Sequence, residues 1–160
     1  MGWKPCICDP DVWMKDYGSH YEYVCVYVVD LAVMSKEPAL FFKQLKEIGK
    51  YKLKGEDVIK YHIGGDFYRD TDGILCYSAK TYIERMESTF KRLFPGEDIK
   101  KYSSPLAPND HPELDTTEEC NEADIVKYQS LIGAMQWAVS LCRYDIHCAV
   151  MTMGRFRAAP

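Results

Sequence analysis

The stretch Tyr23-Val24-Cys25-Val26-Tyr27-Val28-Val29-Asp30-Leu31-Ala32-Val33 is an apolar run with one acid, Asp30, near its centre. Its β-branched and aromatic residues are typical of strands. The apolar segment 21–34 is about twice the usual strand length of ~5–6 residues. We therefore predict two strands joined by a tight turn near Val28-Val29-Asp30, with Val29 and Asp30 at its tip. Valine is a poor turn residue, and no Gly, Asn or Pro stands here; such breaks of local rules often mark functional positions.

Asp30 has two interpretations on the residues alone. A carboxylate at the tip of an apolar hairpin is well placed to hold a metal ion or to meet a ligand. The ordinary alternative is a turn acid that accepts hydrogen bonds from its own backbone. Alternating tyrosines, Tyr21, Tyr23 and Tyr27, fit either stacking on nucleic-acid bases or packing within the sheet.

Around this hairpin the sequence predicts an α+β fold in which antiparallel β-hairpins are packed by helices. A short strand is expected over residues 11–15, before the hairpin. After it, Ser35 is expected to cap a helix over residues 37–50, with Pro38 in the first turn. The apolar residues of that helix recur at helical spacing, which indicates one buried face.

The second half of the chain is predicted to be mainly helical. A second hairpin is expected from residues 58–68 and 74–78, because Asp72-Gly73 between them is a strong turn signal. Apolar residues at steps of three and four then predict three helices. The expected helices are 79–93, 124–141 and 145–157, and the proline-containing segment 94–121 is expected to be a linker.

Composition indicates an ordinary globular chain of 160 residues, 47% hydrophobic and 28% charged. No apolar run approaches the ~20 residues of a membrane span, and Trp3-Lys4-Pro5-Cys6 is not an apolar signal region. The odd number of scattered cysteines, seven, predicts reduced thiols in an intracellular, cytoplasmic setting. A net charge of −4 argues against autonomous nucleic-acid binding, which needs a basic footprint.

For two further patterns we favour a structural interpretation over a functional one. Cys6 and Cys8, with His20 later, lack the paired Cys-x2-Cys or His-x3-His spacing of a zinc site. They are therefore interpreted as scattered thiols. Gly64-Gly65 lacks the Gly-Lys-Ser/Thr continuation of a phosphate-binding loop, so it is interpreted as a strand irregularity.

Tyr27-Val28-Val29-Asp30 resembles the Tyr-x-Asp-Asp turn of reverse transcriptases, in the Tyr-Val-Asp-Asp-Leu form of copia-type LTR retrotransposons. Other family motifs are matched in the family's order over nearly all of the chain. They are Asp9-Pro10-Asp11-Val12-Trp13, Tyr61-His62-Ile63-Gly64-Gly65-Asp66-Phe67, Asp72-Gly73-Ile74 with Tyr82-Ile83, Ser104-Pro105-Leu106, Tyr128-Gln129-Ser130-Leu131-Ile132-Gly133, and Arg143-Tyr144-Asp145-Ile146 with Ala149-Val150. Each match is weak alone, and their shared order carries the resemblance.

The resemblance implies a domain organisation and a reaction. Residues 1–103 would be the C-terminal half of a polymerase palm. Residues 104–160 would be a linker and connection helices that precede a ribonuclease H domain. The family enzymes synthesise DNA on an RNA or DNA template, with a primer–template and deoxynucleotides as partners and Mg²⁺ as cofactor.

Two departures from the family bear on activity. Val29 stands where the turn has its leading Asp, and the 26 residues before Tyr27 hold no counterpart of the family's upstream catalytic Asp or basic fingers. Polymerases use such carboxylates to hold two divalent ions ~3.5–4 Å apart. Of the three metal-binding carboxylates that the resemblance implies, Asp30 remains.

The expected function is therefore a reverse transcriptase fragment that is inactive alone. It would bind Mg²⁺ without high affinity and primer–template weakly or not at all. The alternative is a non-enzymatic interaction module derived from a retroelement, which would bind a protein partner.

Overall fold

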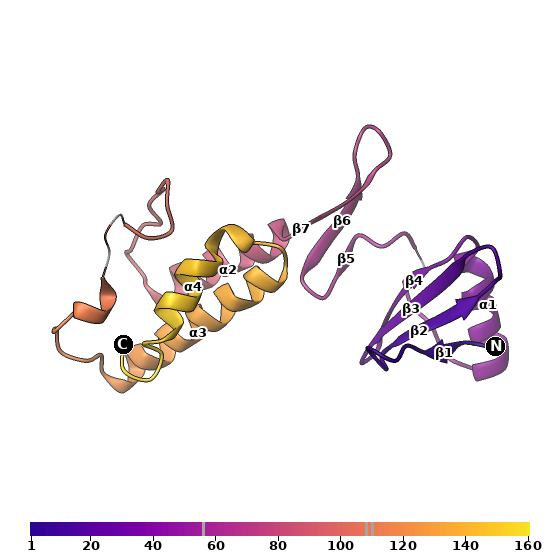
Figure 1. The fold of residues 1–160 in the computed structure, drawn as a ribbon, viewed down its shortest axis with the longest axis horizontal. Coiled ribbons are helices and arrows are strands. Elements are labelled where there is room, and N and C mark those ends of the chain that lie inside the picture. Colours follow the sequence, from indigo (N-terminus) through magenta and orange to yellow (C-terminus); the bar gives the residue numbers. More distant parts are fainter. Residues whose placement is uncertain (56, 108, 110) are drawn as a thin grey trace. The chain divides into compact units, whose positions relative to one another are not determined.

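The computed structural model describes residues 1–55, 57–107, 109 and 111–160. The chain divides into two compact units, residues 1–62 and 63–160 (Figure 1). It contains two antiparallel sheets together with α-helices, as the α+β prediction required. The division into compact units falls between residues 62 and 63. It does not test the predicted boundary between residues 103 and 104, which came from the resemblance and stays a prediction.

The first unit is built on a four-stranded sheet with the order β1-β2-β3-β4. The strands are β1 (Lys4–Pro5), β2 (Val12–Asp16), β3 (Tyr21–Tyr27) and β4 (Asp30–Met34), and all neighbours are antiparallel. The predicted strand near residues 11–15 and the predicted hairpin over residues 21–34 are both confirmed. Helix α1 (Pro38–Gly49) lies against one face of this sheet (Figure 1).

Helix α1 begins one residue later than predicted. Its N-cap residue is Glu37, whose side chain makes no capping hydrogen bond, and Pro38 occupies the first turn. Ser35 Oγ instead accepts a hydrogen bond from the Glu37 N–H at 3.0 Å, two residues further along. The prediction that Ser35 caps the helix is therefore wrong. A serine can satisfy a nearby amide in the turn before a helix as readily as at the cap.

The predicted strand over residues 58–68 is interrupted by a turn. The second sheet has the order β5-β6-β7, with strands β5 (Tyr61–His62), β6 (Gly65–Arg69) and β7 (Leu75–Ser78). Ile63 and Gly64, between β5 and β6, have φ of 49° and 92°. Positive φ at both central residues is the pattern of a type I′ hairpin turn. Gly64 is thus a turn residue, which corrects its interpretation as a strand irregularity.

The turn predicted at Asp72-Gly73 joins β6 to β7. The Asp70 carboxylate accepts hydrogen bonds from the amides of Asp72 and Ile74, at 3.0 and 2.8 Å. Such hydrogen bonds from nearby backbone amides to the side chain make aspartate a common turn residue.

Three α-helices follow: α2 (Lys80–Leu93), α3 (Glu122–Ser140) and α4 (His147–Gly154). The last is shorter than predicted, because a separate 3₁₀ turn, η2 (Tyr144–Ile146), precedes it. The expected linker contains the 3₁₀ turn η1 (Pro112–Leu114). No helix in the described ranges is long and apolar enough to cross a membrane.

The core of the second unit lies where α3 meets α4. Ile132 and Ala138 on α3 are 1% and 0% exposed, and Val150 on α4 is 3% exposed. Two partly buried hydrogen bonds connect neighbouring helices. The Tyr82 hydroxyl donates to the Ala134 carbonyl at 3.0 Å, and the Tyr128 hydroxyl donates to the Met153 carbonyl at 2.8 Å.

Gly64→Ala is expected to lower the free energy of unfolding by about 2–3 kcal/mol. A methyl group there would lie 3.0 Å from both Trp137 Nε1 and Leu141 Cδ1, and the positive φ adds its own penalty of about 1–2 kcal/mol. Gly73→Ala is the matched control. Its φ is +79°, but no atom lies within 4 Å. Urea unfolding followed by circular dichroism measures both variants. Equal losses would show that the contacts with α3 do not constrain Gly64.

Candidate functional site

The hairpin singled out by the sequence closes on the pair Tyr27–Asp30, which leaves Val28 and Val29 as a two-residue turn. The turn thus lies one residue earlier than Val29-Asp30, and Asp30 is the first residue of β4. Val28 has φ of 54° and Val29 does not share this feature. Positive φ at the first turn position alone is the pattern of a type II′ turn, which normally has Gly there. Valine at this φ is strained.

Pairing places Tyr27 and Asp30 on the same face of the sheet. Because successive side chains alternate, this is the face opposite Val24, which is 3% exposed. Val28 and Val29, at the turn, are each 86% exposed. Tyr27 and Asp30 therefore project from the open face of the sheet, beside a fully exposed turn.

The tyrosines of β3 share this open face. Tyr21 and Tyr27 are both about half exposed, and Tyr21 and Tyr23 have ring centroids 6.5 Å apart. These rings cover the outside of the sheet and do not form its core. Their proposed stacking on bases stays a prediction.

Two more acids lie in the β1–β2 loop, at the same end of the sheet as the turn. The Val26 N–H donates to the Asp11 carbonyl at 2.9 Å. The Asp9 carboxylate accepts from the Asp11 N–H, also at 2.9 Å. Burial, and then the nearby charge of Asp9, raise the pKa of the Cys25 thiol. Asp9 is therefore close to β3 at Cys25, which lies on the same face of the strand as Tyr27.

These acids do not form a metal centre with Asp30. In the described ranges, which leave out residues 56, 108 and 110, no three His, Cys, Asp or Glu residues form a group that could hold a metal ion. Val29 supplies methyl groups where magnesium would need oxygen. The residues present thus do not fit the two-ion centre that the resemblance implies. Cys6, Cys8 and His20 likewise form no group that could hold a zinc ion within the part of the chain that the structure describes.

Among the described residues, Glu22 is the buried charged residue, with 6% exposure. Its Oε1 accepts a hydrogen bond from the Lys36 N–H at 3.0 Å and lies 3.4 Å from His20 Nε2. Burial alone would raise the pKa of this carboxyl. The hydrogen bonds from Ser35, the Lys36 amide and His20 outweigh burial and lower the pKa below its ordinary value. Glu22 is therefore held as a carboxylate inside the first unit.

Sequence reasoning missed Glu22. The signal was an acid two residues before the buried Val24 on an alternating strand, which places it on the inward face. An inward carboxylate needs hydrogen-bond partners, because burying it unpaired is costly. Two of those partners, Ser35 and the Lys36 amide, come from the β4–α1 junction, which the strand alone could not indicate.

The chain is homologous to transposon-encoded proteins. It is 27% identical over 139 residues to a putative transposon Ty5-1 protein of Saccharomyces cerevisiae, covering 86% of this chain and 43% of that protein. It is 23% identical to the retrovirus-related Pol polyprotein from transposon RE1 of Arabidopsis thaliana, covering 100% of this chain and 10% of the polyprotein. It is 28% identical to the corresponding polyprotein from transposon TNT 1-94 of Nicotiana tabacum, covering 95% and 12%.

The chain thus spans less than half the length of each of these relatives. No family model matches the chain, and no solved structure matches it. The similarities support a retroelement origin.

Val28→Asn is expected to raise the free energy of unfolding by about 1 kcal/mol, because asparagine tolerates the left-handed conformation that strains a β-branched residue. Val29→Asn is the matched control. Both valines are 86% exposed, but only Val28 of the two has positive φ. The control should change stability by less than about 0.5 kcal/mol. Thermal and urea unfolding of the two variants test this. A gain for Val29→Asn equal to that for Val28→Asn would place the strain elsewhere.

Proposed function

We propose that this chain is part of the reverse transcriptase region of a copia-type retrotransposon Pol polyprotein. It would comprise the second half of the palm and the connection helices that follow. The observation that carries this proposal is the Tyr27-Val28-Val29-Asp30 hairpin. Its two central residues form an exposed turn, and Asp30 begins the return strand on the open face. That placement suits a carboxylate that meets a substrate from outside the sheet.

Two further observations support the assignment. The family's other motifs occur in order along the sequence, from Asp9 to Val150. Two of the relatives carry the name retrovirus-related Pol polyprotein. Both observations agree with a retroelement polymerase more readily than with an unrelated α+β domain.

We further propose that these 160 residues do not synthesise DNA by themselves. In the family's reaction a primer 3′-hydroxyl attacks the α-phosphate of a deoxynucleotide, and the bound ions stabilise the developing charge. In this sequence the Val29 side chain has no oxygen, and Asp30 is the one carboxylate in the motif Tyr27-Val28-Val29-Asp30. A single exposed carboxylate cannot orient two ions, so the main source of rate acceleration is missing.

The purified chain is expected to incorporate no nucleotide above a no-protein control. The assay is primer extension on a primed homopolymer template with magnesium, and separately with manganese. Asp30→Ala serves as the matched variant and should behave identically. Metal-dependent incorporation that disappears in Asp30→Ala would overturn the proposed inactivity, and it would at the same time identify Asp30 as a metal ligand.

Val29→Asp alone is expected to leave the chain inactive. The change adds one carboxylate beside Asp30, but a third is still needed, and the two adjacent acids would repel each other. Addition of the family's upstream segment with its Asp-bearing strand, together with Val29→Asp, should give synthesis. Primer extension compares three proteins: the single variant, the addition alone and the combination. If the protein with the added upstream segment is equally active with Val29 retained, Val29 is not the cause of the inactivity.

Weak nucleic-acid binding is expected, because the chain is acidic with a net charge of −4. Even non-specific binders typically show dissociation constants of ~10⁻⁴–10⁻⁶ M near physiological salt. Fluorescence anisotropy with a labelled primer–template measures the affinity at several salt concentrations. Sub-micromolar affinity at physiological salt would contradict the charge argument.

The second candidate function is a non-enzymatic interaction module. In the sheet order of the described residues β4 is an edge strand, so one side of its backbone has no neighbouring strand. Edge strands can accept a strand from a partner. Sedimentation of the chain at increasing concentration separates the two candidates, since self-association through β4 would favour the module.

A further inference from the structure

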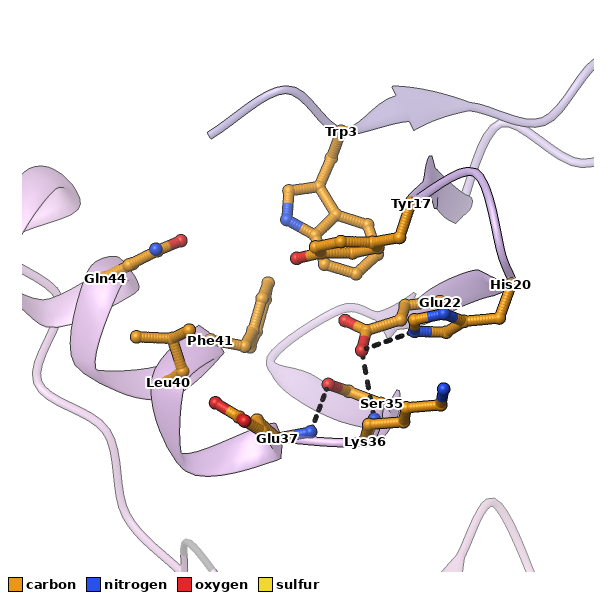
Figure 2. A pocket seen from close by; sticks show the side chains of 10 residues that line it. All are labelled: Trp3, Tyr17, His20, Glu22, Ser35, Lys36, Glu37, Leu40, Phe41 and Gln44. Carbon is orange, nitrogen blue, oxygen red and sulfur yellow. Dashed lines mark hydrogen bonds and ion pairs between the residues drawn. The ribbon is translucent and has the colours of Figure 1, made fainter.

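The first unit contains a cavity of about 240 Å³, and Figure 2 shows the side chains around it. In this view Trp3 and Tyr17 lie above Phe41 and Leu40, and the Glu22 carboxylate lies beneath the Tyr17 ring. Pockets for drug-sized ligands are larger, about 300–1,000 Å³. This cavity therefore suits a small molecule or a single chemical group.

The cavity combines a buried charge with an accessible oxygen. The hydrogen bond from Lys36 N–H and the contact with His20 Nε2 both fall on Oε1 of Glu22. In Figure 2 the second carboxylate oxygen points towards the aromatic side chains, and the Ser35 hydroxyl also donates a hydrogen bond to this carboxyl group. The ion-pair partner of Glu22 is His20, which is charged only when protonated. A permanent positive charge in the cavity would give this carboxylate a counter-ion whether or not His20 is protonated.

The aromatic rings make the cavity suitable for a cation of low hydration. The rings of Trp3 and Phe41 meet edge to face, with centroids 5.3 Å apart. Tyr17 stacks on His20 at 5.2 Å and already has the Lys15 ammonium 4.7 Å from its ring centroid. The faces of Tyr17 are thus engaged, and the Trp3 indole is left as the wall for a ligand. Tryptophan is also the best aromatic partner for a cation.

Other ligand classes fit this cavity less well. An anion would meet the negative charges of Glu22 and Glu37, which outnumber the permanent positive charge of Lys36 in the lining. A neutral apolar group would displace water from the Glu22 carboxylate without balancing its charge, at a cost in free energy. An unmodified ammonium is strongly hydrated, and the cavity walls are mainly carbon. A methylated ammonium carries the charge and loses less hydration on entry.

We propose that this cavity binds a methylated ammonium group, with Glu22 as its counter-ion and Trp3 as its aromatic wall. The site lies on the face of the sheet that α1 covers, and it does not depend on the proposed polymerase origin. Glu22 also has an ordinary structural role, because it holds the Lys36 amide where the chain enters α1. The experiment separates the two roles.

The test titrates the whole chain with choline chloride at constant ionic strength. The indole N–H signal of Trp3 is followed by NMR, and Trp13 and Trp137 provide internal controls. The comparison ligand is 3,3-dimethyl-1-butanol, which has the shape of choline without its charge. We expect a saturable shift of the Trp3 signal with choline and at least tenfold weaker binding of the alcohol. Equal binding of the two ligands, or no saturable shift with choline, would overturn the proposal.

Glu22→Gln is the decisive variant. Glutamine keeps an oxygen for the Lys36 N–H and removes the charge, so α1 should stay in place while choline binds at least tenfold more weakly. Glu47→Gln is the matched control, because Glu47 is an exposed carboxylate paired with Lys43. It should bind choline as the unaltered chain does. Unchanged affinity in Glu22→Gln would overturn the proposal. If that variant does not fold, the comparison of choline with the alcohol decides the question alone.

Discussion

The register between β3 and β4 is the constraint on which the first unit depends. Side chains alternate along a strand, so a shift of one residue would exchange the two faces of the sheet. The observed register sets Tyr27 opposite Asp30 and Val24 opposite Val33. Burying a valine side chain contributes about 1.5–3 kcal/mol, whereas a left-handed residue costs about 1–2 kcal/mol. Burial of Val24, together with the helix-covered face around it, therefore outweighs the strain at Val28.

The same register keeps the two candidate sites apart. Glu22 and Val24 face α1, while Tyr27 and Asp30 face outwards from the same pair of strands. A substitution at the turn should therefore leave the cavity unaltered, since no side chain of the turn lines it. This separation allows the polymerase proposal and the cation-binding proposal to succeed or fail independently.

Sequence reasoning located the elements whose signal is local. The hairpin over residues 21–34 follows from its excess length, and the turn at Asp72-Gly73 follows from its residues. The Ile63-Gly64 turn was missed because β-branched and aromatic neighbours favour a continuous strand, and only the backbone angles reveal the break. The start of α1 was misplaced because the Ser35 hydroxyl binds an amide before the helix and not within it.

The candidate turn was located to within one residue, but its role could not be read from the same local signal. A turn acid and a metal ligand look alike until the surrounding groups are known, because coordination needs several oxygens from separate segments. For Glu22 the limitation is similar. Its importance depends on the Lys36 amide and on His20, and neither contact follows from strand periodicity.

The contrast between Val29 and Glu22 shows which positions folding itself can preserve. Val29 is 86% exposed, and substitutions at exposed sites usually change stability by less than about 0.5 kcal/mol. Folding therefore does not oppose an exchange of Asp for Val there, and only a metal-dependent activity would require the carboxylate. Glu22 is buried and holds a backbone amide, so its loss would leave that amide without a partner. A chain that no longer needed catalysis would thus lose the turn acid first and keep the buried one.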